Sequence, residues 1–348
     1  MATSSLNGFD GQPEMLDDGW EVSGLQQADL DAQALGNVVR KVETVGPPDF
    51  HSLLIARNGK LAFERYFYGY DSDRLHDMRS AGKSFTSTLI GIAIDQGAVP
   101  DVDCTILPFF RRYEPIKNRD DRKESIRVRD LLTMMSGLDA DDNDPATPGC
   151  EDNMLRSDDW VRYSLDLPMI EAPGQRWVYA GPNSVLLAGL LESATERPVL
   201  DFAIDHLFEP LKIDSFGWES SPIGTVAGQG FLSVCGRDML KLGQLFLDDG
   251  SWRGRRIVSE QWVRASTECR VELPNDNHPG YGYQWWTGSF TVDSRSFACF
   301  FASGNGGNKI FVLPSLAMVV ATASSAYNQP YMHARSHQVL AEVIRAAF

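Results

Sequence analysis

The short β-rich segments of this chain lie near its two ends, and their placement constrains the fold more than any other feature. Residues 51–70 read as two strands joined at Asn58 and Gly59, which is the strongest short-range signal for a β-hairpin. Three further runs rich in β-branched and aromatic residues lie near the C-terminus, separated by Gly and Pro turns: residues 295–301, 309–314 and 316–324. We therefore predict an antiparallel sheet assembled from both ends of the chain.

Helical patterns flank the β-rich ends and fill the region between them. Apolar residues recur at helical spacing from Asp29 to Val45, and a helical tail runs from about Tyr331 to Ala347. Helical patterns in the middle of the chain occupy residues 128–137, 182–196 and 236–250. The simplest fold is α/β, with an antiparallel sheet flanked by helices and an inserted all-α lobe.

We expect this architecture to form one catalytic unit with two lobes. An irregular acidic leader covers residues 1–25, the sheet lobe combines residues 26–105 with 285–348, and the mostly helical lobe covers residues 106–284. A chain of 348 residues that is 43% hydrophobic can bury a large core across two such lobes.

The charge balance excludes several kinds of partner. The chain has 32 Lys and Arg against 47 Asp and Glu, a net charge of −15, which argues against a nucleic-acid groove or an anionic membrane surface. No apolar run approaches the roughly 18 residues needed to span a bilayer. The first basic residue is Arg40, so the start of the chain lacks a secretory signal pattern, and we expect a cytoplasmic location.

The cysteines and histidines do not form a recognisable framework or metal site. The five cysteines are scattered and without C-x-x-C spacing, which argues against both a disulfide framework and a zinc site. His333 and His337 stand four residues apart, but no acidic base accompanies them as in H-E-x-x-H. We therefore expect neither a metal nor an organic cofactor.

The stretch RSAGKSFTS, residues 79–87, permits two interpretations. The Gly-Lys-Ser within it looks like the end of a phosphate-binding loop, whereas Ser80 and Lys83 form S-x-x-K, the start of a serine hydrolase motif. A phosphate-binding loop requires a first glycine at position 77, where this chain has Asp77. A carboxylate at that point would face a phosphate, which argues strongly against nucleotide binding, and this interpretation is kept only as a rival that an ATP titration would settle.

Ser80 and Lys83 are predicted to share one face of a helix that runs to about Gln96 and stops at Gly97. Their Cβ atoms would lie about 5 to 6 Å apart, close enough for an amine to contact the hydroxyl. An N-cap role for Ser80 is the structural alternative, but a cation in the first helical turn opposes the helix dipole by about 0.3 to 1 kcal/mol. We predict that this helix end and burial favour the neutral amine of Lys83, which could then accept a proton.

Two downstream features complete a possible active site. Tyr179 stands just before a tight turn that opens a helix, which would hold its phenol at a fixed point. A Gly-rich strand end at residues 304–307 lets a substrate approach the backbone closely and can supply an N–H to an oxyanion. Taken singly, Tyr179 also suits a core aromatic, and the glycines suit a hairpin turn.

Together and in this order, these three features resemble the serine hydrolase family of class C β-lactamases and penicillin-binding proteins. Residues 131–138, 236–263 and 281–286 also resemble stretches of that family. The resemblance implies a β-lactamase/transpeptidase-like fold, in which Ser80 attacks a carbonyl, Lys83 and Tyr179 share the proton relay, and an acyl-enzyme is hydrolysed. It further implies an oxyanion hole formed by the N–H of Ser80 and an N–H of the 304–306 turn, which we assign to Asn305.

The chain departs from the family pattern at two motifs. The second motif is often Y-x-N, but here Gly181 takes the third place, and the nearest amide is Asn183, which either substitutes for it or begins the helix. The third motif is K-T-G or H-x-G in β-lactamases, whereas this chain has Ala302, Ser303 and Gly304. Replacing that cation removes a charge-assisted contact of roughly 1.5 to 3 kcal/mol, so we predict weak or absent β-lactamase activity. Lys309 lies nearby in the sequence but is expected to point along the next strand.

We therefore predict a serine hydrolase that cleaves a carboxylic ester or a small linear amide, close to the esterase and 6-aminohexanoate-dimer hydrolase branch of the family. The alternatives are a β-lactamase or D-aminopeptidase-like activity, and a catalytically silent relative that binds an acyl ligand. The expected partner is a small-molecule substrate, with no nucleic acid and no membrane, while the oligomeric state is left open. The predicted oxyanion and substrate contacts are Ser80, Asn183, Tyr281, Trp286, Ser303, Gly304, Asn305 and Gly306.

Overall fold

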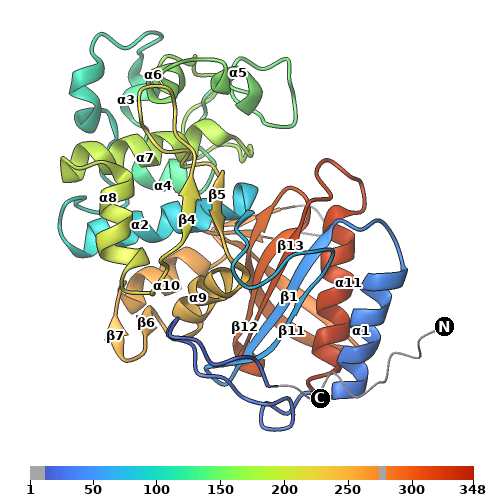
Figure 1. Cartoon of the computed structure of the whole chain (residues 1–348). Helices are drawn as coiled ribbons and strands as arrows, with labels where there is room; N and C mark the ends of the chain where they lie inside the picture. The colour runs from blue at the N-terminus through green and yellow to red at the C-terminus, as the bar shows by residue number, and fades with distance from the viewer. Residues whose placement is uncertain (1–11, 274–279) are drawn as a thin grey trace.

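In a computed structural model that describes residues 12–273 and 280–348, both ends of the chain contribute to one eight-stranded antiparallel sheet, as predicted. Figure 1 shows the N-terminal strand β1, in blue, beside the red C-terminal strands. The strands in spatial order are β2 (Lys60–Tyr66), β1 (Phe50–Arg57), β13 (Met318–Ser324), β12 (Asn308–Leu313), β11 (Arg295–Gly304), β10 (Trp286–Val292), β9 (Gly280–Tyr281) and β8 (Val271–Glu272).

The predicted hairpin is present between β1 and β2. Arg57 pairs with Lys60, so Asn58 and Gly59 are the two residues of the turn. Both adopt left-handed backbone, with φ of +53° at Asn58 and +76° at Gly59. Because Asn and Gly tolerate this conformation best, the turn and the strand register follow from the local sequence.

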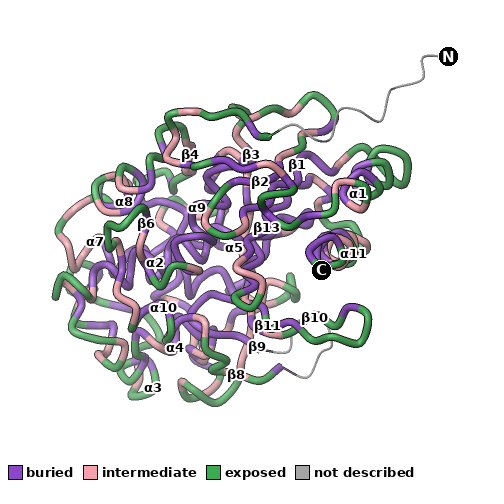
Figure 2. Tube along the Cα trace, turned by 90° about the horizontal axis from the view of Figure 1, so that it is seen from below, coloured by how far each residue is buried: buried purple, intermediate pink, exposed green. Residues whose placement is uncertain are grey.

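Helices cover both faces of the sheet. The terminal helices α1 (Ala32–Thr44) and α11 (Met332–Arg345) lie side by side over one face (Figures 1 and 2). On the other face α9 (Gly236–Leu247) packs against β1, β12 and β13. A Cβ at Gly243 would lie 2.4 Å from the side chain of Val319, so this glycine allows the close approach of helix and sheet.

The second lobe consists mainly of short helices, seen at the upper left of Figure 1. Its elements are η3 (Leu107–Tyr113), α3 (Asp121–Glu124), α4 (Val128–Leu132), α5 (Glu151–Leu155), α6 (Trp160–Leu165), α7 (Gly181–Thr195), α8 (Val199–Ala203) and η4 (Ile204–Phe208). The remaining helical elements are η2 (Arg79–Gly82), α2 (Lys83–Asp95), α10 (Glu260–Thr267) and η5 (Pro314–Leu316). One small sheet contains β3 (His76–Asp77), β5 (Leu232–Val234) and β4 (Phe216–Trp218), in that order. A second small sheet contains β6 (Ser251–Trp252) and β7 (Arg255–Arg256).

The helix α2 is the most deeply buried helix near the site. Its residues from Lys83 to Ala93 are all buried, as the purple trace of α2 in Figure 2 shows. It packs against α7, and a Cβ at Gly91 would overlap the ring of Trp262. The buried hydroxyls of Ser84, Thr86 and Ser87 donate to backbone carbonyls of neighbouring segments, and this packing gives the residues at the start of the helix a rigid support.

The division at residues 105 and 285 stays a prediction. The helix α9 belongs by sequence to the 106–284 segment but packs on the sheet. In the described part of the leader, Trp20 is 2% exposed and its Nε1 donates a hydrogen bond to the carbonyl of Arg237 at 3.1 Å. The leader residues 12–25 therefore pack against the core, although they are mostly irregular.

Candidate active site

Ser80 and Lys83 lie at the start of the buried helix. Ser80 belongs to the 3-10 turn η2, which runs directly into α2, and Lys83 Nζ donates to Ser80 Oγ at 3.1 Å. The Ser80 hydroxyl thus contacts Lys83, and η2 has no side-chain cap. Gly97 follows the helix with φ of +75°, where the sequence predicted the stop. The i, i+3 juxtaposition expected from the motif is therefore present.

The turn that carries Ser80 is held by its backbone neighbours. Arg79 has a left-handed φ of +52°, and Asp77 accepts from its N–H at 2.7 Å and pairs with its guanidinium at 3.0 Å. A Cβ at Gly304 would lie 2.0 Å from the carbonyl oxygen of Met78, and one at Gly230 would lie 2.9 Å from that of Arg79. Both glycines are required because two backbone segments touch this turn, and they support its strained conformation.

Lys83 is buried, with 1% of its surface exposed, and its Nζ also donates to the carbonyl of Gln229 at 2.7 Å. The Nζ lies 4.8 Å from the centre of the Tyr179 ring. Burial lowers the pKa of Lys83, but Tyr179, Glu151 and Asp142 raise it, and the net direction is upward. The direction of this pKa opposes the predicted neutral amine, because Tyr179 and two carboxylates distant in sequence favour the ammonium.

The sequence reasoning missed Asp142, which holds the segment containing Tyr179. Its N–H donates to the carbonyl of Tyr179 at 3.0 Å, and its carboxylate accepts from the N–H groups of Gly181 at 2.8 Å and Glu151 at 3.2 Å. Burial raises the pKa of Asp142, while Lys83 and these N–H groups act against it. Asp142 lies in an Asp- and Asn-rich loop, whose sequence indicates turns and carries no catalytic signal.

Glu151 and Gln229 also line the cleft and were not predicted. Burial raises the pKa of Glu151 to about 7. Gln229 is fully buried, and neither amide atom of its side chain has a hydrogen-bond partner within residues 12–273 and 280–348. The glycines on each side of Gln229 were the one available signal of a close backbone approach.

Tyr179 stands two residues before the start of α7, as predicted, and faces the cleft. Trp286 also lines the cleft, and its ring stacks on that of Tyr179 at 5.6 Å with 27° between the planes. Tyr281 is 1% exposed and contacts Tyr179 edge-on at 6.3 Å from within a hydrophobic cluster. The structure thus places Trp286 where a substrate could reach it, whereas Tyr281 supports Tyr179 from behind and its predicted substrate contact is corrected.

The Gly-rich strand end lies beside Ser80. Ser303, Gly304 and Asn305 line the same cleft as Ser80. The side chain of Asn305 is locked to Asn328, donating to its side-chain oxygen at 2.6 Å and accepting from its N–H at 2.8 Å. Gly306 has φ of +90° in the turn that follows, and its N–H lies 3.3 Å from the sulfur of Met332. The Gly304 end of this segment is brought against the turn that carries Ser80, whereas Gly306 does not line the cleft, so its predicted substrate contact is corrected.

Lys309 on β12 stands opposite Ser303 on β11 in the antiparallel register, and its Nζ donates to Ser303 Oγ at 2.6 Å. Lys309 therefore points across to Ser303, and the expectation that it points along its own strand is wrong.

Asn183 does not reach the cleft. It is 1% exposed within the first turn of α7, and its amide nitrogen donates to the carbonyl of Ala180 at 3.3 Å. It lines a separate small cavity of about 10 Å³ with Met134. The predicted substrate contact of Asn183 is corrected, since of the two roles open from the sequence the structure favours the start of the helix.

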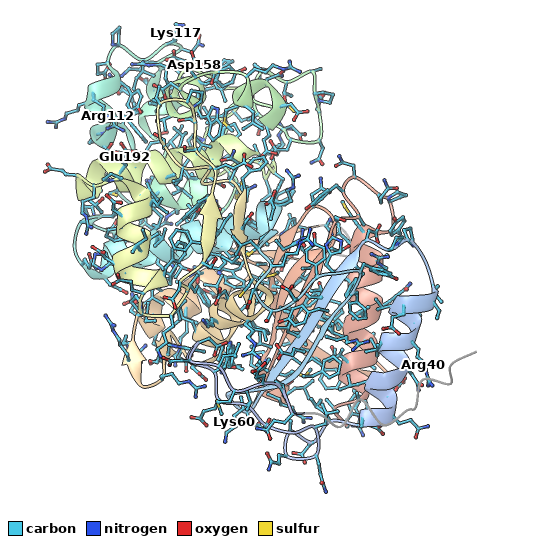
Figure 3. All side chains as sticks on the ribbon, viewed as in Figure 1. Arg40, Lys60, Arg112, Lys117, Asp158 and Glu192 are labelled. Carbon is cyan, nitrogen blue, oxygen red and sulfur yellow. The ribbon has the colours of Figure 1, made fainter. Side chains whose placement is uncertain are left out.

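The cleft between the lobes has a volume of about 670 Å³. Its helical side carries the acidic residues Asp142, Glu151 and Asp152, and its sheet side carries Arg79, Ser303 and His333. A second hollow of about 400 Å³ lies at the outer face of the helical lobe, where Arg112 and Glu192 form an ion pair at 3.1 Å (Figure 3). That second hollow contains none of the predicted catalytic residues.

Within the described ranges, no group of three His, Cys, Asp or Glu side chains is arranged to hold a metal ion. No helix in the described part of the chain is both long and apolar enough to cross a membrane.

Comparisons with known proteins agree with this geometry. The 6-aminohexanoate-dimer hydrolase of Paenarthrobacter ureafaciens is 24% identical to this chain over 256 residues. The match covers 68% of this chain and 63% of that relative, so this chain spans less than two thirds of the relative's length. A hydrolase with promiscuous acyltransferase activity, EstCE1, superposes with a TM-score of 0.73 at 14% identity over 92% of this chain and 98% of its own. The D-amino acid amidase of Ochrobactrum anthropi SV3, complexed with L-phenylalanine amide, superposes with a TM-score of 0.69 at 16% identity. The superposition covers 90% of this chain and 97% of the amidase.

At these identities the two structures show the fold alone, and they confirm the predicted β-lactamase/transpeptidase-like architecture. The family resemblance is confirmed by the model of the Beta-lactamase family, which matches residues 51–343. The chain therefore belongs to the Beta-lactamase family.

Proposed function

We propose that this protein is a serine hydrolase that cleaves a carboxylic ester or a small linear amide through an acyl-enzyme on Ser80. The observation that carries the proposal is the contact of 3.1 Å between Ser80 Oγ and Lys83 Nζ, beside Tyr179 in the largest described cleft. A weak hydroxyl nucleophile needs an adjacent group to orient it and to manage its proton, and this arrangement provides both.

The charge on Lys83 assigns the proton-transfer roles. An ammonium donates hydrogen bonds and cannot take the proton of Ser80, so in this proposal Tyr179 accepts it as a phenolate whose own proton has passed to Lys83. The positive charge of Lys83 would stabilise the phenolate before the transfer and the negative charge that develops on Ser80 Oγ during it. Tyr179 then returns the proton to the leaving group, and water releases the acid and restores Ser80 by the reverse route.

The oxyanion of the tetrahedral intermediate would be held by backbone donors. We assign the N–H of Ser80 and the N–H of Asn305, because β11 ends directly against the turn that carries Ser80. The lock between Asn305 and Asn328 would keep this donor in place before the substrate arrives. Such preorganised donors stabilise charge that develops only in the transition state.

A linear substrate suits the features of the cleft better than a β-lactam. Ala302 takes the place of the expected cation of the third motif. The cleft of about 670 Å³ is lined by the stacked Tyr179 and Trp286 and by Asn328. Two similar proteins are named for linear amides, a 6-aminohexanoate dimer and an amino acid amide, which supports this substrate class.

Labelling with a fluorophosphonate probe, followed by intact mass and peptide mapping, tests the proposal. We expect one adduct on Ser80 in the wild-type protein and none in Ser80→Ala. Ser125→Ala, which removes an exposed hydroxyl in the helical lobe, should label like the wild type. An unlabelled wild-type protein, or an adduct that persists in Ser80→Ala, would exclude Ser80 as the nucleophile and favour the silent acyl-binding relative.

A further inference from the structure

An unpaired carboxyl group lies in the wall of the cleft. Glu151, the first residue of α5, lines the cleft together with Ser80. Within residues 12–273 and 280–348 its carboxylate accepts no hydrogen bond and forms no ion pair, although its backbone N–H donates to Asp142 at 3.2 Å. A partly buried carboxylate that serves only the fold is normally paired, so the fold alone does not explain Glu151.

The carboxyl group of Glu151 reaches the space beside Gly181. A Cβ at Gly181 would lie 3.4 Å from Glu151 Oε1, and 3.5 Å from both Cβ and Cγ of Gln229. Glu151 and Gln229 therefore meet where the side chain of the Y-x-N asparagine would begin. Because Gly181 follows Tyr179 by two residues, this place adjoins the proposed proton relay.

Gln229 brings two more unpaired polar atoms to the same place. Its side chain is fully buried, and its amide nitrogen and oxygen have no partner in the described ranges. Its main chain is held firmly, since its carbonyl accepts from Lys83 at 2.7 Å and a Cβ at Gly228 would lie 2.3 Å from the carbonyl oxygen of Ser184. A buried water needs about two to four polar partners, and the amide of Gln229 and the carboxylate of Glu151 supply them.

The charges around Glu151 suit a group that exchanges a proton near neutral pH. Burial raises the pKa of Glu151 to about 7, and nearby charges of both signs act on it as well. The cations among them are Lys83 and Arg79, which lie on either side of Ser80 in the chain. The carboxyl group is thus within electrostatic range of both flanks of the nucleophile, and an acid–base group works best when its pKa lies near the working pH.

We propose that Glu151 is the base that takes the proton of the hydrolytic water when the Ser80 ester is cleaved, and that the side-chain amide of Gln229 orients this water. The inference rests on the proposed function, because it needs an acyl-enzyme on Ser80. It divides the proton transfers between two groups: Tyr179 serves acylation, and Glu151 gives the reverse route a base of its own.

The water oxygen forms a bond to the carbonyl carbon of the Ser80 ester, and one proton of the water passes to the Glu151 carboxylate. When the tetrahedral intermediate collapses, the bond between this carbon and Ser80 Oγ breaks. Oγ then takes a proton from the Lys83 ammonium, which it contacts at 3.1 Å. The proton on Glu151 passes to Lys83, so the carboxylic acid leaves and both side chains regain their starting charges.

The test measures the two halves of the reaction separately with 4-nitrophenyl acetate. Mixing with the enzyme in excess gives the acylation rate as release of 4-nitrophenol, and quenched samples analysed by mass spectrometry give the rate at which Ser80 loses its acetyl group. In Glu151→Gln we expect acylation within about threefold of the wild type and deacylation slower by about a hundredfold or more, as for loss of a positioned base. Acetylated Ser80 should therefore accumulate in this variant.

Two further variants and an added nucleophile separate this role from a structural one. Gln229→Leu should slow deacylation by about tenfold, the worth of one hydrogen bond. Glu209→Gln removes an exposed carboxylate of the helical lobe and should leave both rates unchanged. Hydroxylamine attacks an ester without the help of a base, so it should release the acetyl group that accumulates in Glu151→Gln.

The pH dependence of deacylation gives a second readout. As the pH falls through about 7, Glu151 takes up a proton and can no longer accept one from water, so the deacylation rate should fall. This acid limb should be absent in Glu151→Gln. In Asp142→Asn it should move to lower pH and remain, because the charge of Asp142 raises the pKa of Glu151.

The charged and titratable groups that face Glu151 are Lys83, Arg79, Asp142, Asp152, Tyr179 and His333. The pKa of His333 is lowered to about 3 and that of Lys83 is raised, so neither accounts for a limb near pH 7. Burial raises the pKa of Asp142, and the Asp142→Asn variant therefore tests the assignment of the limb.

Deacylation of Glu151→Gln at the wild-type rate, or an equal loss of acylation and deacylation, would overturn the inference. The second result would mean that Glu151 acts only through the charge of Lys83, which both halves need. If neither the wild type nor Glu151→Gln forms an acetyl ester on Ser80, the proposed function itself fails, and this inference fails with it.

Discussion

Two Ser–Lys pairs face one cleft, and the chain builds them in different ways. Ser80 and Lys83 belong to consecutive turns of one helical segment and lie 3.1 Å apart, whereas Ser303 and Lys309 lie on neighbouring strands and are 2.6 Å apart. Both lysines are buried, yet the pKa of Lys83 is raised and that of Lys309 is lowered to about 7. Tyr179 and the carboxylates near Lys83 raise the one pKa, and burial in the apolar layer lowers the other, so the residue type and the contact distance do not by themselves determine the pKa of a lysine.

The largest expected effect concerns the first pair. Ser80→Ala should abolish ester and amide hydrolysis, because no other group would form the acyl-enzyme. Ser303→Ala should keep measurable hydrolysis of a neutral ester, since Ser303 lines the cleft but takes no part in the proposed acyl transfer. Initial rates for the two variants with the same phenyl ester make the comparison, and turnover that survives in Ser80→Ala would remove the distinction between the pairs.

The next effect concerns the proton relay. Tyr179→Phe and Lys83→Ala should each lower kcat by about a hundredfold or more, as expected for loss of a positioned acid–base group. Tyr281→Phe keeps the supporting ring behind Tyr179 and should retain most activity. If Tyr179→Phe behaved like Tyr281→Phe, the relay would have to run through Lys83 alone.

A smaller effect tests why Lys83 is charged. Asp142→Asn removes a charge that raises the pKa of Lys83, so that pKa should fall while an amide oxygen still accepts from a neighbouring N–H. If the ammonium is the active form, the alkaline limb of kcat/KM moves to lower pH. The full pH–rate profile is the measurement, with Asp158→Asn at the outer end of the helical lobe as the control (Figure 3). A shift of the acid limb instead would identify neutral Lys83 as the base.

The smallest expected effect is a change in the free energy of unfolding when Lys309 of the second Ser–Lys pair is replaced. The lowered pKa of Lys309 means that the unfolded chain binds this proton more strongly than the folded chain between about pH 7 and the ordinary value of 10.5. Lys309 therefore destabilises the fold most below pH 7, and this effect diminishes as the pH approaches 10.5. Lys309→Met should raise the free energy of unfolding by about 1 to 4 kcal/mol at pH 6 and less at pH 9.

Denaturant unfolding at the two pH values gives this result directly. The same substitution at exposed Lys117 should leave the stability nearly unchanged. A loss of stability in Lys309→Met at pH 6 would mean that the lysine serves the packing of the sheet.

Much of the fold could be predicted because the signals are local. The turn at Asn58 and Gly59 determines the register of the first hairpin, and strands β11, β12 and β13 follow from three short β-rich runs and their turns. The placement of Ser80 beside Lys83 follows from helical geometry over three residues. The same local logic went wrong at Asn183 and Tyr281, because spacing does not tell which side of an element faces the cleft and which faces the core.

The sequence by itself determined the sheet made from both chain ends, the contact between Ser80 and Lys83, and the family. The tertiary structure alone decided which distant side chains surround each lysine. Asp142 reaches Tyr179 across a loop, and Lys309 reaches Ser303 across two strands, and neither contact has a local signal in the chain. The physical reason is that hydrogen-bond geometry within a turn is set over a few residues, whereas the charge of a buried group depends on every element packed around it.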